Sequence, residues 1–383
     1  NAAFHADETA PATSNHIVHL VPSPDQSDIL TYHKADVPEP SGPTMDLTAT
    51  NIVIATGAKP RPLPGNPFAG ALIDSTQALE VNEFPSSAVI IGAGAIALEF
   101  ASMWNAAGSK VTLLIRKDRV LSAWDRRAGT TLTRELKRHG VNIITRASVT
   151  HVDTGANLGA TVHYTREGQD GEQSVWGEIA LVAIGRDPIT DPAWGVTIDD
   201  HGHVATDAYG RTDKPGVWAV GDVTAGHALA HRAFEQGIVI AETIAGLNPK
   251  PVDEATVPQI VFSFPEAASV GLTVEQAQAR EDLIEIKETN YPMLANARML
   301  MSGTAGSLTI VSGCDAANPD TPRVLGVHMV SQMASDIIAE AEQLVGNRVP
   351  LADAARLVHP HPTFSETLGE ALLKADGRPL HTR

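Results

Sequence analysis

The chain has 383 residues, a formal net charge of −17 and a single cysteine, Cys314. The acidic balance argues against nucleic acid and against an anionic membrane surface as the main partner, although it leaves room for a local basic pocket that holds a phosphate. One thiol cannot form an internal disulfide, so nothing indicates an oxidising compartment, and we expect a cytoplasmic protein. The longest apolar run, residues 88–98, is well short of the roughly 20 residues that a membrane-spanning helix needs.

In chain order, the pattern first predicts a small antiparallel hairpin over residues 14–36 and a buried strand over 49–57 that ends at a glycine turn. Residues 87–116 then predict a strand, a glycine turn, a helix and a second strand. They are followed by a helix at about 125–139 and a strand at 141–147. Because strands and helices alternate, this part of the chain predicts a parallel sheet.

Farther along, short alternating strands with glycine-rich turns precede an apolar strand at 179–184. Residues 203–222 predict a strand, a loop and a buried strand, and 227–246 predict a helix that is closed by Gly246. From residue 258 onward the pattern predicts an α+β arrangement of strands and helices. The predicted strands lie near 259–263, 308–312 and 324–330, and the predicted helices lie near 334–345, 351–357 and 363–375.

The turn in "AVIIGAGAIALE" places Gly92, Gly94 and Ala97 in a G-x-G-x-x-A pattern. Gly92 lets the chain turn tightly, Gly94 lets the backbone approach a pyrophosphate, and a small residue at position 97 lets the helix approach the sheet. The helix N-terminus then offers unpaired N–H groups to the phosphates. Since a strand precedes this turn and a helix and a second strand follow, we predict a dinucleotide site; the alternative is a glycine turn in another α/β unit.

The end of the second strand bears on the choice of nucleotide. An NAD site normally carries Asp or Glu there, whereas this chain has Ile115 followed by Arg116 and Lys117, with Asp118 already beyond the strand. Two cations suit a 2′-phosphate, so we favour NADP(H) over NAD(H). The alternative is that Arg116 and Lys117 are a solvated pair.

A second strand end carries an acid. "VWAVGD" ends a buried strand with Gly221 and Asp222, and "IVIATG" ends another at Gly57. An aspartate at the carboxyl edge of a parallel sheet can accept hydrogen bonds from ligand hydroxyls. Without further context, a turn aspartate that caps the next helix is an equally good interpretation.

Several motifs together resemble the flavin-dependent pyridine nucleotide–disulfide oxidoreductases, and among them most the dihydrolipoamide dehydrogenases. The similarity runs from about residue 15 to 375. The motifs are "ATNIVIATGAKP", "GAGAIALEFA", "VAIGRDP", "GVWAVGDV", "LAHRAFEQG", "VPQIVFSFPEAASVGLT" and "HPHPTFSE". The resemblance implies an enzyme that transfers electrons between NAD(P)H and a disulfide or dithiol through FAD.

The resemblance also implies residue roles. Thr56 and Gly57 would lie against FAD, and Asp222, preceded by Gly221, would hold its ribityl chain. Leu229 and Ala230 would begin the helix that points at the isoalloxazine. Glu99 would sit near the nicotinamide carboxamide, and Gly185 would border the nicotinamide site.

The implied α/β fold is a Rossmann-like NAD(P)-binding domain inserted in a partial FAD-binding domain and followed by an α+β interface domain. We predict the C-terminal remnant of the first FAD segment at residues 1–87, the NAD(P)-binding domain at 88–205, the return segment of the FAD domain at 206–254 and the interface domain at 255–383. We expect a homodimer with a small-molecule or lipoyl dithiol substrate.

Two features depart from the family pattern. The family's opening G-x-G-x-x-G for FAD and its redox C-x4-C pair are not in this sequence, so about the first hundred residues of the family are expected to be absent. Cys314 cannot replace two thiols, and a small buried hydrophobe is its simplest interpretation. One hypothesis is therefore that this chain alone is a catalytically silent, dimerising NADP-binding fragment.

The other departure is the Arg116–Lys117 pair. Because of this pair, an NADPH-dependent disulfide or quinone reductase of the same fold is an alternative hypothesis.

The segment "HPHPTFSE" fixes a histidine. Pro360 and Pro362 restrict the backbone on either side of His361, and Glu366 follows at the start of a predicted helix, within reach of the imidazole. A carboxylate on one ring nitrogen orients the ring and leaves the other nitrogen free to take a proton. Helix capping is the alternative interpretation from the residues alone. In the resembled family, the histidine of this motif takes a proton from a dithiol at the partner subunit, which implies that His361 is the base and Glu366 its orienting group.

Other histidines do not indicate a metal. No second ligand set at metal spacing accompanies His201, His203, His227 or His231, so we predict no metal site.

Overall fold

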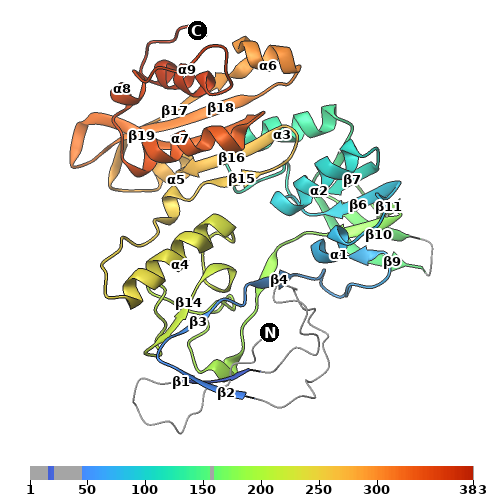
Figure 1. The fold of residues 1–383 in the computed structure, drawn as a ribbon. Coiled ribbons are helices and arrows are strands. Elements are labelled where there is room, and N and C mark those ends of the chain that lie inside the picture. Colours follow the sequence, from blue (N-terminus) through green and yellow to red (C-terminus); the bar gives the residue numbers. More distant parts are fainter. Residues whose placement is uncertain (1–15, 21–44, 156–158, 383) are drawn as a thin grey trace. The chain divides into compact units, whose positions relative to one another are not determined.

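The structure is a computed structural model that describes residues 16–20, 45–155 and 159–382 (Figure 1). By their contacts these residues divide into two compact units. The first contains the described residues up to Lys59 together with Arg186–Glu254, and the second contains the described residues of 60–185 and 255–382. The four domain ranges expected from the sequence stay predictions. None of the helices in the described ranges has the length and hydropathy that a membrane span requires.

The second unit contains a five-stranded parallel sheet in the order β5-β12-β6-β7-β8. Its strands are β5 (Leu72–Ile73), β6 (Ser87–Ile91), β7 (Lys110–Leu114), β8 (Asn142–Ile144) and β12 (Ile179–Val182), and its helices are α1 (Ser75–Leu79), α2 (Ala95–Ala106) and α3 (Arg126–Arg138). The strand–turn–helix–strand unit predicted over 87–116 is confirmed as β6, α2 and β7.

Both faces of this sheet are covered, and this explains why its strands are apolar throughout. On β6, Ala88 and Ile90 belong to the core that contains α2 and α3. Val89 and Ile91 belong to the opposite core, which contains an antiparallel three-stranded sheet in the order β11-β10-β9. The strands of that sheet are β9 (Ala147–Thr154), β10 (Ala160–Arg166) and β11 (Gln173–Gly177). Successive side chains of a strand point to opposite faces, so an uninterrupted apolar run is what a doubly covered strand requires.

The same unit contains a second, antiparallel sheet in the order β15-β16-β19-β18-β17. Its strands are β15 (Gln259–Val261), β16 (Glu266–Gly271), β17 (Leu283–Pro292), β18 (Ser307–Asp315) and β19 (Asn318–Ser331). Helices α7 (Ala334–Gly346), α8 (Leu351–Ala354) and α9 (Glu366–Ala375) share one core with this sheet, and α3 packs on its other face. Two short helices complete it, α5 (Val274–Gln278) and α6 (Ala297–Ser302).

Sequence reasoning missed β16, β17, α5 and α6 and began the last helix at residue 363 rather than at Glu366. Strand β17 is an edge strand with the sequence LIEIKETNYP, and most of its side chains are exposed or half-buried. Charged side chains are common at the edge of a sheet, where they hide the strand signal.

The first unit is smaller. Strand β3 (Ile52–Ile54) pairs in parallel with β14 (Val217–Ala219), and α4 (Ala230–Ile244) follows β14 in the chain. Strand β1 (His16–Leu20) pairs with β2 (Met45–Ala49), so the first strand of the expected 14–36 hairpin takes a different partner; the rest of that hairpin lies outside the described residues. The remaining two-stranded sheet consists of β4 (Ala58–Pro60) and β13 (Arg186–Pro188).

Candidate functional site

The turn between β6 and α2 requires glycine at its first position. Gly92 has φ +143°, and a Cβ placed there would overlap the backbone carbonyl of Ala183, which directly follows the neighbouring strand β12. The Gly92 N–H donates to the Leu114 carbonyl at 3.1 Å, which ties the turn to β7. Ala97 is fully buried at the contact of α2 with the sheet. These observations match the roles that the sequence assigned to Gly92 and Ala97 in the turn.

The N-terminus of α2 has room for a ligand. Gly94 is its N-cap in an extended conformation, and no side chain caps the helix. A Cβ built at Gly94 meets no atom within 4 Å. The first N–H groups of α2 therefore face open space with the positive end of the helix dipole, and this geometry fits a pyrophosphate.

Arg116 and Lys117 directly follow β7 on the same edge of the sheet. Both are exposed, and within the described part of the chain neither forms an ion pair. Asp118 is already engaged, because its carboxylate accepts from Arg119 Nη1 at 3.1 Å. The cations that the sequence proposed for a 2′-phosphate are thus available, whereas the nearest acid is partly neutralised.

Glu99 and Gly185 are the residues expected beside a nicotinamide. The carboxylate of Glu99, on α2, accepts a hydrogen bond from the Phe262 N–H at 3.0 Å, immediately after β15. This contact, which no sequence motif indicated, provides Glu99 with a structural partner. Gly185 has φ +130°, and its carbonyl accepts from the Arg61 N–H at 3.1 Å.

In the first unit, the carboxyl ends of β3 and β14 lie side by side. The Val220 N–H donates to the Ile54 carbonyl at 3.0 Å, which brings the segment after β3 next to Gly221 and Asp222. Asp222 is half-buried, and its carboxylate has no hydrogen-bond partner among the residues that the structure describes. An unpaired acid at this edge is suited to accept hydrogen bonds from ligand hydroxyls, as an FAD ribityl chain would require.

The other residues expected at FAD surround the same edge. The Thr56 hydroxyl donates to the Ile189 carbonyl at 2.6 Å, and Gly57 has φ +71°. Helix α4 begins at Ala230 with Leu229 as its N-cap, and no side chain caps it. The N-terminus of α4 therefore also has donors to offer to a ligand.

The histidine of the C-terminal segment is paired as expected. His361 Nδ1 lies 2.7 Å from Glu366 Oε2. The histidine side chain is 73% exposed, whereas the Glu366 side chain is only 16% exposed. The other oxygen of Glu366 is also fixed, because Asn296 Nδ2 donates to its Oε1 at 2.9 Å. Asn296 Nδ2 also donates to the Thr363 carbonyl at 3.0 Å. A fixed carboxylate thus orients an imidazole whose other nitrogen is open to an incoming group.

Asn296 is a functional candidate that sequence reasoning missed. It is buried, lies at the N-cap of α6 and accepts from the Met299 N–H at 3.0 Å. Its distance along the chain from Glu366 leaves no local pattern that could have linked the two.

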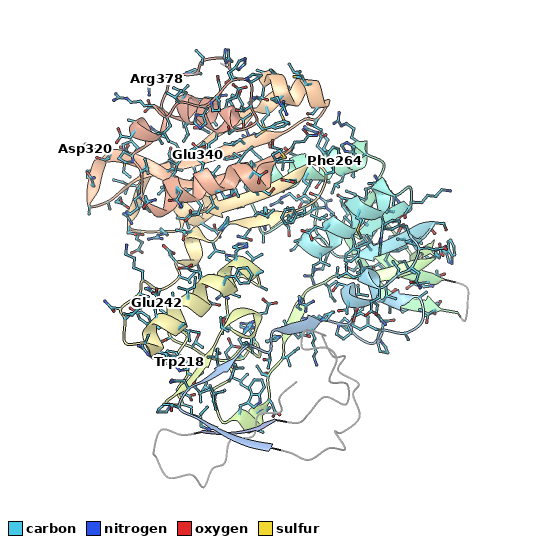
Figure 2. All side chains as sticks on the ribbon, viewed as in Figure 1. Trp218, Glu242, Phe264, Asp320, Glu340 and Arg378 are labelled. Atoms are coloured by element: carbon cyan, nitrogen blue, oxygen red, sulfur yellow. The ribbon has the colours of Figure 1, made fainter. Side chains whose placement is uncertain are left out.

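His359 has a different environment from His361. Its Nε2 lies 2.8 Å from Glu340 Oε1, and its side chain is largely buried. Glu340 lies on α7 (Figure 2). The hydrogen bond to Glu340 raises the pKa of His359 above its usual range. On the other side, the ring lies against Gly369 of α9, where a Cβ would overlap it. This histidine therefore fixes the segment that leads to His361.

Cys314 is fully buried on β18. Burial raises the pKa of its thiol. Such a thiol is inert, as the interpretation of Cys314 as a small buried hydrophobe implied.

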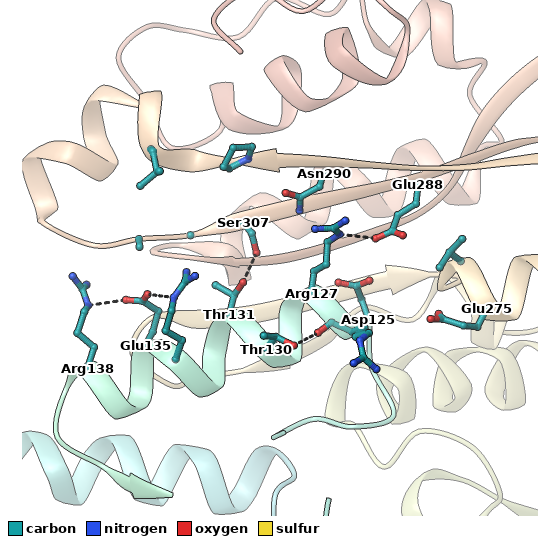
Figure 3. A pocket seen from close by; sticks show the side chains of 17 residues that line it. Asp125, Arg127, Thr130, Thr131, Glu135, Arg138, Glu275, Glu288, Asn290 and Ser307 are labelled. Carbon is teal, nitrogen blue, oxygen red and sulfur yellow. Dashed lines mark hydrogen bonds and ion pairs between the residues drawn. The ribbon is translucent and has the colours of Figure 1, made fainter. Parts of the chain in front are cut away.

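A cavity of about 850 Å³ lies between α3 and the β17–β18 edge (Figure 3). Two of its arginines pair with acids: Arg127 Nε lies 3.0 Å from Glu288 Oε1, and Arg138 Nε lies 2.9 Å from Glu135 Oε2. None of the residues expected at a site from the sequence is among those that line this cavity. Since the opposite charges already pair, its wall presents no uniform field to a charged ligand.

Comparisons with known proteins find a family that matches most of this chain. Residues 16–237 match the family described as pyridine nucleotide-disulphide oxidoreductase, and residues 257–372 match the dimerisation domain of that family. The chain is 38% identical over 341 residues to a dihydrolipoyl dehydrogenase of Cupriavidus necator and 36% identical over 341 residues to one of Bacillus subtilis. Each match covers 88% of this chain and 70% of the relative.

Two solved structures are similar over most of the chain. LpdA of Mycobacterium tuberculosis has a TM-score of 0.80 and 26% identity, and the match covers 97% of this chain and 76% of that one. The HOCl-induced flavoprotein disulfide reductase RclA of Escherichia coli has a TM-score of 0.75 and 26% identity, with 86% and 74% covered.

Proposed function

The chain belongs to the pyridine nucleotide-disulphide oxidoreductase family, whose members use FAD and NAD(P), and we propose that it acts on dihydrolipoyl groups. The family supplies the reaction class, namely electron transfer between a nicotinamide nucleotide and a dithiol or disulfide through FAD. The substrate assignment is supported by the names of the relatives at 33–38% identity, which are dihydrolipoyl dehydrogenases.

The observation that carries the proposal is the pair of His361 and Glu366. Glu366 Oε2, at 2.7 Å, favours a proton on His361 Nδ1 and leaves Nε2 as the acceptor. Because the ring is largely exposed, a thiol of a second molecule can reach Nε2. His361 then takes the thiol proton, and Glu366 stabilises the imidazolium that forms.

The remaining residues bind and orient. Bound FAD would supply the two-electron relay between nicotinamide and disulfide. The open N-terminus of α2, beginning at Gly94, would hold the nucleotide pyrophosphate, and Arg116 with Lys117 would hold a 2′-phosphate. Asp222 would accept hydrogen bonds from the ribityl hydroxyls.

The test uses the complete gene product, purified with its flavin. It measures kcat/KM for the oxidation of dihydrolipoamide by NADP⁺ and by NAD⁺. Reduction of glutathione disulfide and of a quinone is measured beside it. We expect the highest kcat/KM with dihydrolipoamide. A quinone that is turned over equally fast or faster would overturn the substrate assignment while leaving the family intact.

Arg116 and Lys117 favour a second candidate, an NADPH-dependent disulfide or quinone reductase of the same fold. Both cations follow β7 without an ion-pair partner in the described residues. A strong preference for NADPH together with slow dihydrolipoamide oxidation would select this candidate. Fast dihydrolipoamide oxidation would reject it.

We further infer a homodimer in which His361 works at the dithiol of the partner subunit. A dimerisation domain is present at residues 257–372. Within it, Leu300, Met301 and Val358 are exposed, and Val358, three residues before His361, is 96% exposed. Exposed apolar side chains of this kind are typical of an interface.

Sedimentation velocity tests the dimer. We expect a dimer for the natural protein and a shift towards monomer for Val358→Asp. Leu79→Asp is the matched control, because Leu79 is also exposed but lies on α1, outside the dimerisation domain. A monomeric natural protein, or a Val358→Asp variant as dimeric as the control, would contradict the proposed interface.

A further inference from the structure

Two histidines on the β9–β10 surface face each other across neighbouring strands. His151 and His163 are direct cross-strand partners, and their rings stack at a centroid distance of 4.1 Å and an interplanar angle of 7°. Asp153 lies two residues after His151 and therefore on the same face of β9. The strand register thus places two imidazoles and a carboxylate together. None of the residues assigned above to the redox chemistry belongs to β9, β10 or β11.

The separations of these groups match those of ligands around one metal ion. His163 Nε2 lies 3.0 Å from Asp153 Oδ2, and His151 Nε2 lies 3.9 Å from the same oxygen. The three candidate ligand atoms all lie within 4.8 Å of one another. Two ligands at 2.0–2.1 Å from a tetrahedral zinc ion are about 3.3 Å apart, so modest side-chain rotations at this exposed surface bring the three atoms to that spacing.

The far side of the two rings carries a second carboxylate. Glu172, from the turn before β11, places one oxygen 3.8 Å from His151 Nδ1 and the other 3.7 Å from His163 Nδ1. The hydroxyl of Thr150 donates to Glu172 at 2.7 Å, and the strand pairing shifts by one residue beside Thr150. In the structure His163 Nε2 hydrogen-bonds Asp153 Oδ2, so a bound ion would displace the proton that these two atoms share. The charge of Glu172 on the far side favours protons on the two Nδ1 atoms, which leaves both Nε2 atoms as ligands.

We propose that His151, His163 and Asp153 bind a divalent transition-metal ion, with Glu172 as a positioning residue. Imidazole and carboxylate donors favour Zn²⁺, Ni²⁺ and Cu²⁺, whereas Mg²⁺ and Ca²⁺ prefer oxygen alone. The side chains of His151 and Asp153 are 46% and 70% exposed, so water completes the coordination and the ion exchanges with solution.

The experiment titrates Zn²⁺ into the complete, untagged gene product after treatment with a chelator, and calorimetry follows the binding. We expect one zinc ion per chain at this site and no binding of Mg²⁺ under the same conditions. His163→Ala and Asp153→Asn should each abolish that site. His201→Ala is the histidine control, and Ser174→Ala, opposite His163 on β11, is the local control; both should bind as the natural protein does.

Two further readouts separate ligands from mere neighbours. Electron paramagnetic resonance of bound Cu²⁺ should show coupling to two imidazole nitrogens in the natural protein and to one in His151→Ala. Glu172→Gln should weaken zinc binding by about 10–100-fold without changing the stoichiometry. Unchanged affinity in that variant would refute the positioning role. Undiminished binding in folded His163→Ala and Asp153→Asn variants, or no zinc binding by the natural protein, would overturn the site.

Discussion

At the scale of single residues, the difference in exposure between His361 and Glu366 separates their roles. Glu366 is held on both oxygens, by His361 and by Asn296, and is largely buried. Among the residues that the structure describes, Glu366 is the one hydrogen-bond partner of His361, whose ring faces outward. A group that must meet a second molecule has to be accessible, whereas the group that orients it gains from being fixed.

Replacing His361 by Gln should separate the two half-reactions. The dithiol half-reaction should fall by about 10²-fold or more, because glutamine cannot take the thiol proton. Reduction of the flavin by NAD(P)H should stay nearly unchanged. Rapid-mixing absorbance of the flavin measures each half-reaction separately.

His381→Gln is the matched control for that variant. His381 is also exposed and also lies 2.6 Å from a largely buried carboxylate of α9, that of Glu370, but it is outside the HPHPTFSE segment. It should leave both half-reactions unchanged. An equal loss of both half-reactions in His361→Gln would argue against its role as the base.

Arg116→Glu tests the choice of nucleotide. It replaces a cation with an acid that repels a 2′-phosphate and can accept from a 2′-hydroxyl. We expect KM for NADPH to rise much more than KM for NADH, by about tenfold or more for the loss of one charged contact of roughly 1.5–3 kcal/mol. Lys110→Glu makes the same charge change at the opposite end of β7 and should leave the preference intact. If Arg116→Glu behaves like this control, the basic pair is a solvated surface.

At the scale of elements, the turn between β6 and α2 contains two glycines that are needed for different reasons. Gly92 is required by the fold, because its φ is positive and a Cβ would overlap the Ala183 carbonyl just after β12. Gly94 has an ordinary φ of −91° and open space around it. Only a bound ligand would make a side chain at position 94 unfavourable.

Gly92→Ala and Gly94→Ala should therefore have opposite effects. Gly92→Ala should destabilise the protein by roughly 1–3 kcal/mol or prevent folding, from the strained φ and the overlap with Ala183. Gly94→Ala should unfold at nearly the natural urea midpoint but bind NADPH more weakly. Urea unfolding and nucleotide titration measure the two effects. Normal NADPH affinity in Gly94→Ala would contradict the placement of the pyrophosphate at this turn.

Helices α7 and α9 together hold the segment that carries His361. Glu340 of α7 bonds His359 at 2.8 Å, and Gly369 of α9 leaves the space that the His359 ring fills. The hydrogen bond raises the pKa of His359, so its stabilising effect is present at low pH and is lost as pH rises above the usual histidine range. The segment that leads to His361 is thereby attached to two packed helices rather than to a free loop.

At the scale of the whole molecule, the ion pairs of Asp315 make the free energy of unfolding depend on pH in the acidic range. The Asp315 carboxylate lies 3.0 Å from Arg323 Nη2 and 2.6 Å from Arg348 Nη2, and these contacts join the β18–β19 hairpin to the end of α7. The hydrogen bond to Arg323 lowers the pKa of Asp315 to about 2. Because the folded-state pKa is depressed, the stabilisation is present above about pH 4 and is lost as pH falls towards 2.

Arg323→Met should reduce the free energy of unfolding at pH 7 by about 1 kcal/mol, after solvent screening at this partly exposed pair. The difference from the natural protein should shrink as pH falls from 4 to 2. Urea unfolding at a series of pH values measures it. Arg280→Met, which removes an exposed pair with Asp282, is the control and should change stability less. A difference that does not depend on pH would show that Arg323 acts through packing alone.

The sequence by itself determined the features that are local along the chain. The G-x-G-x-x-A turn lies within one strand–turn–helix unit, and His361 reaches Glu366 across five positions. The backbone within so short a span has few conformations, so residue types and their spacing define the geometry. The same local motifs were enough to indicate the family.

Only the tertiary structure decided which distant residues meet. Asn296 behind Glu366, Phe262 on Glu99, and His163 beside His151 all depend on how helices pack and which strands pair. A register shift of one residue would turn His163 to the other face of its strand. The cluster on β9 and β10 is assembled by pairing across strands, which the spacing of histidines and acids along the chain does not encode.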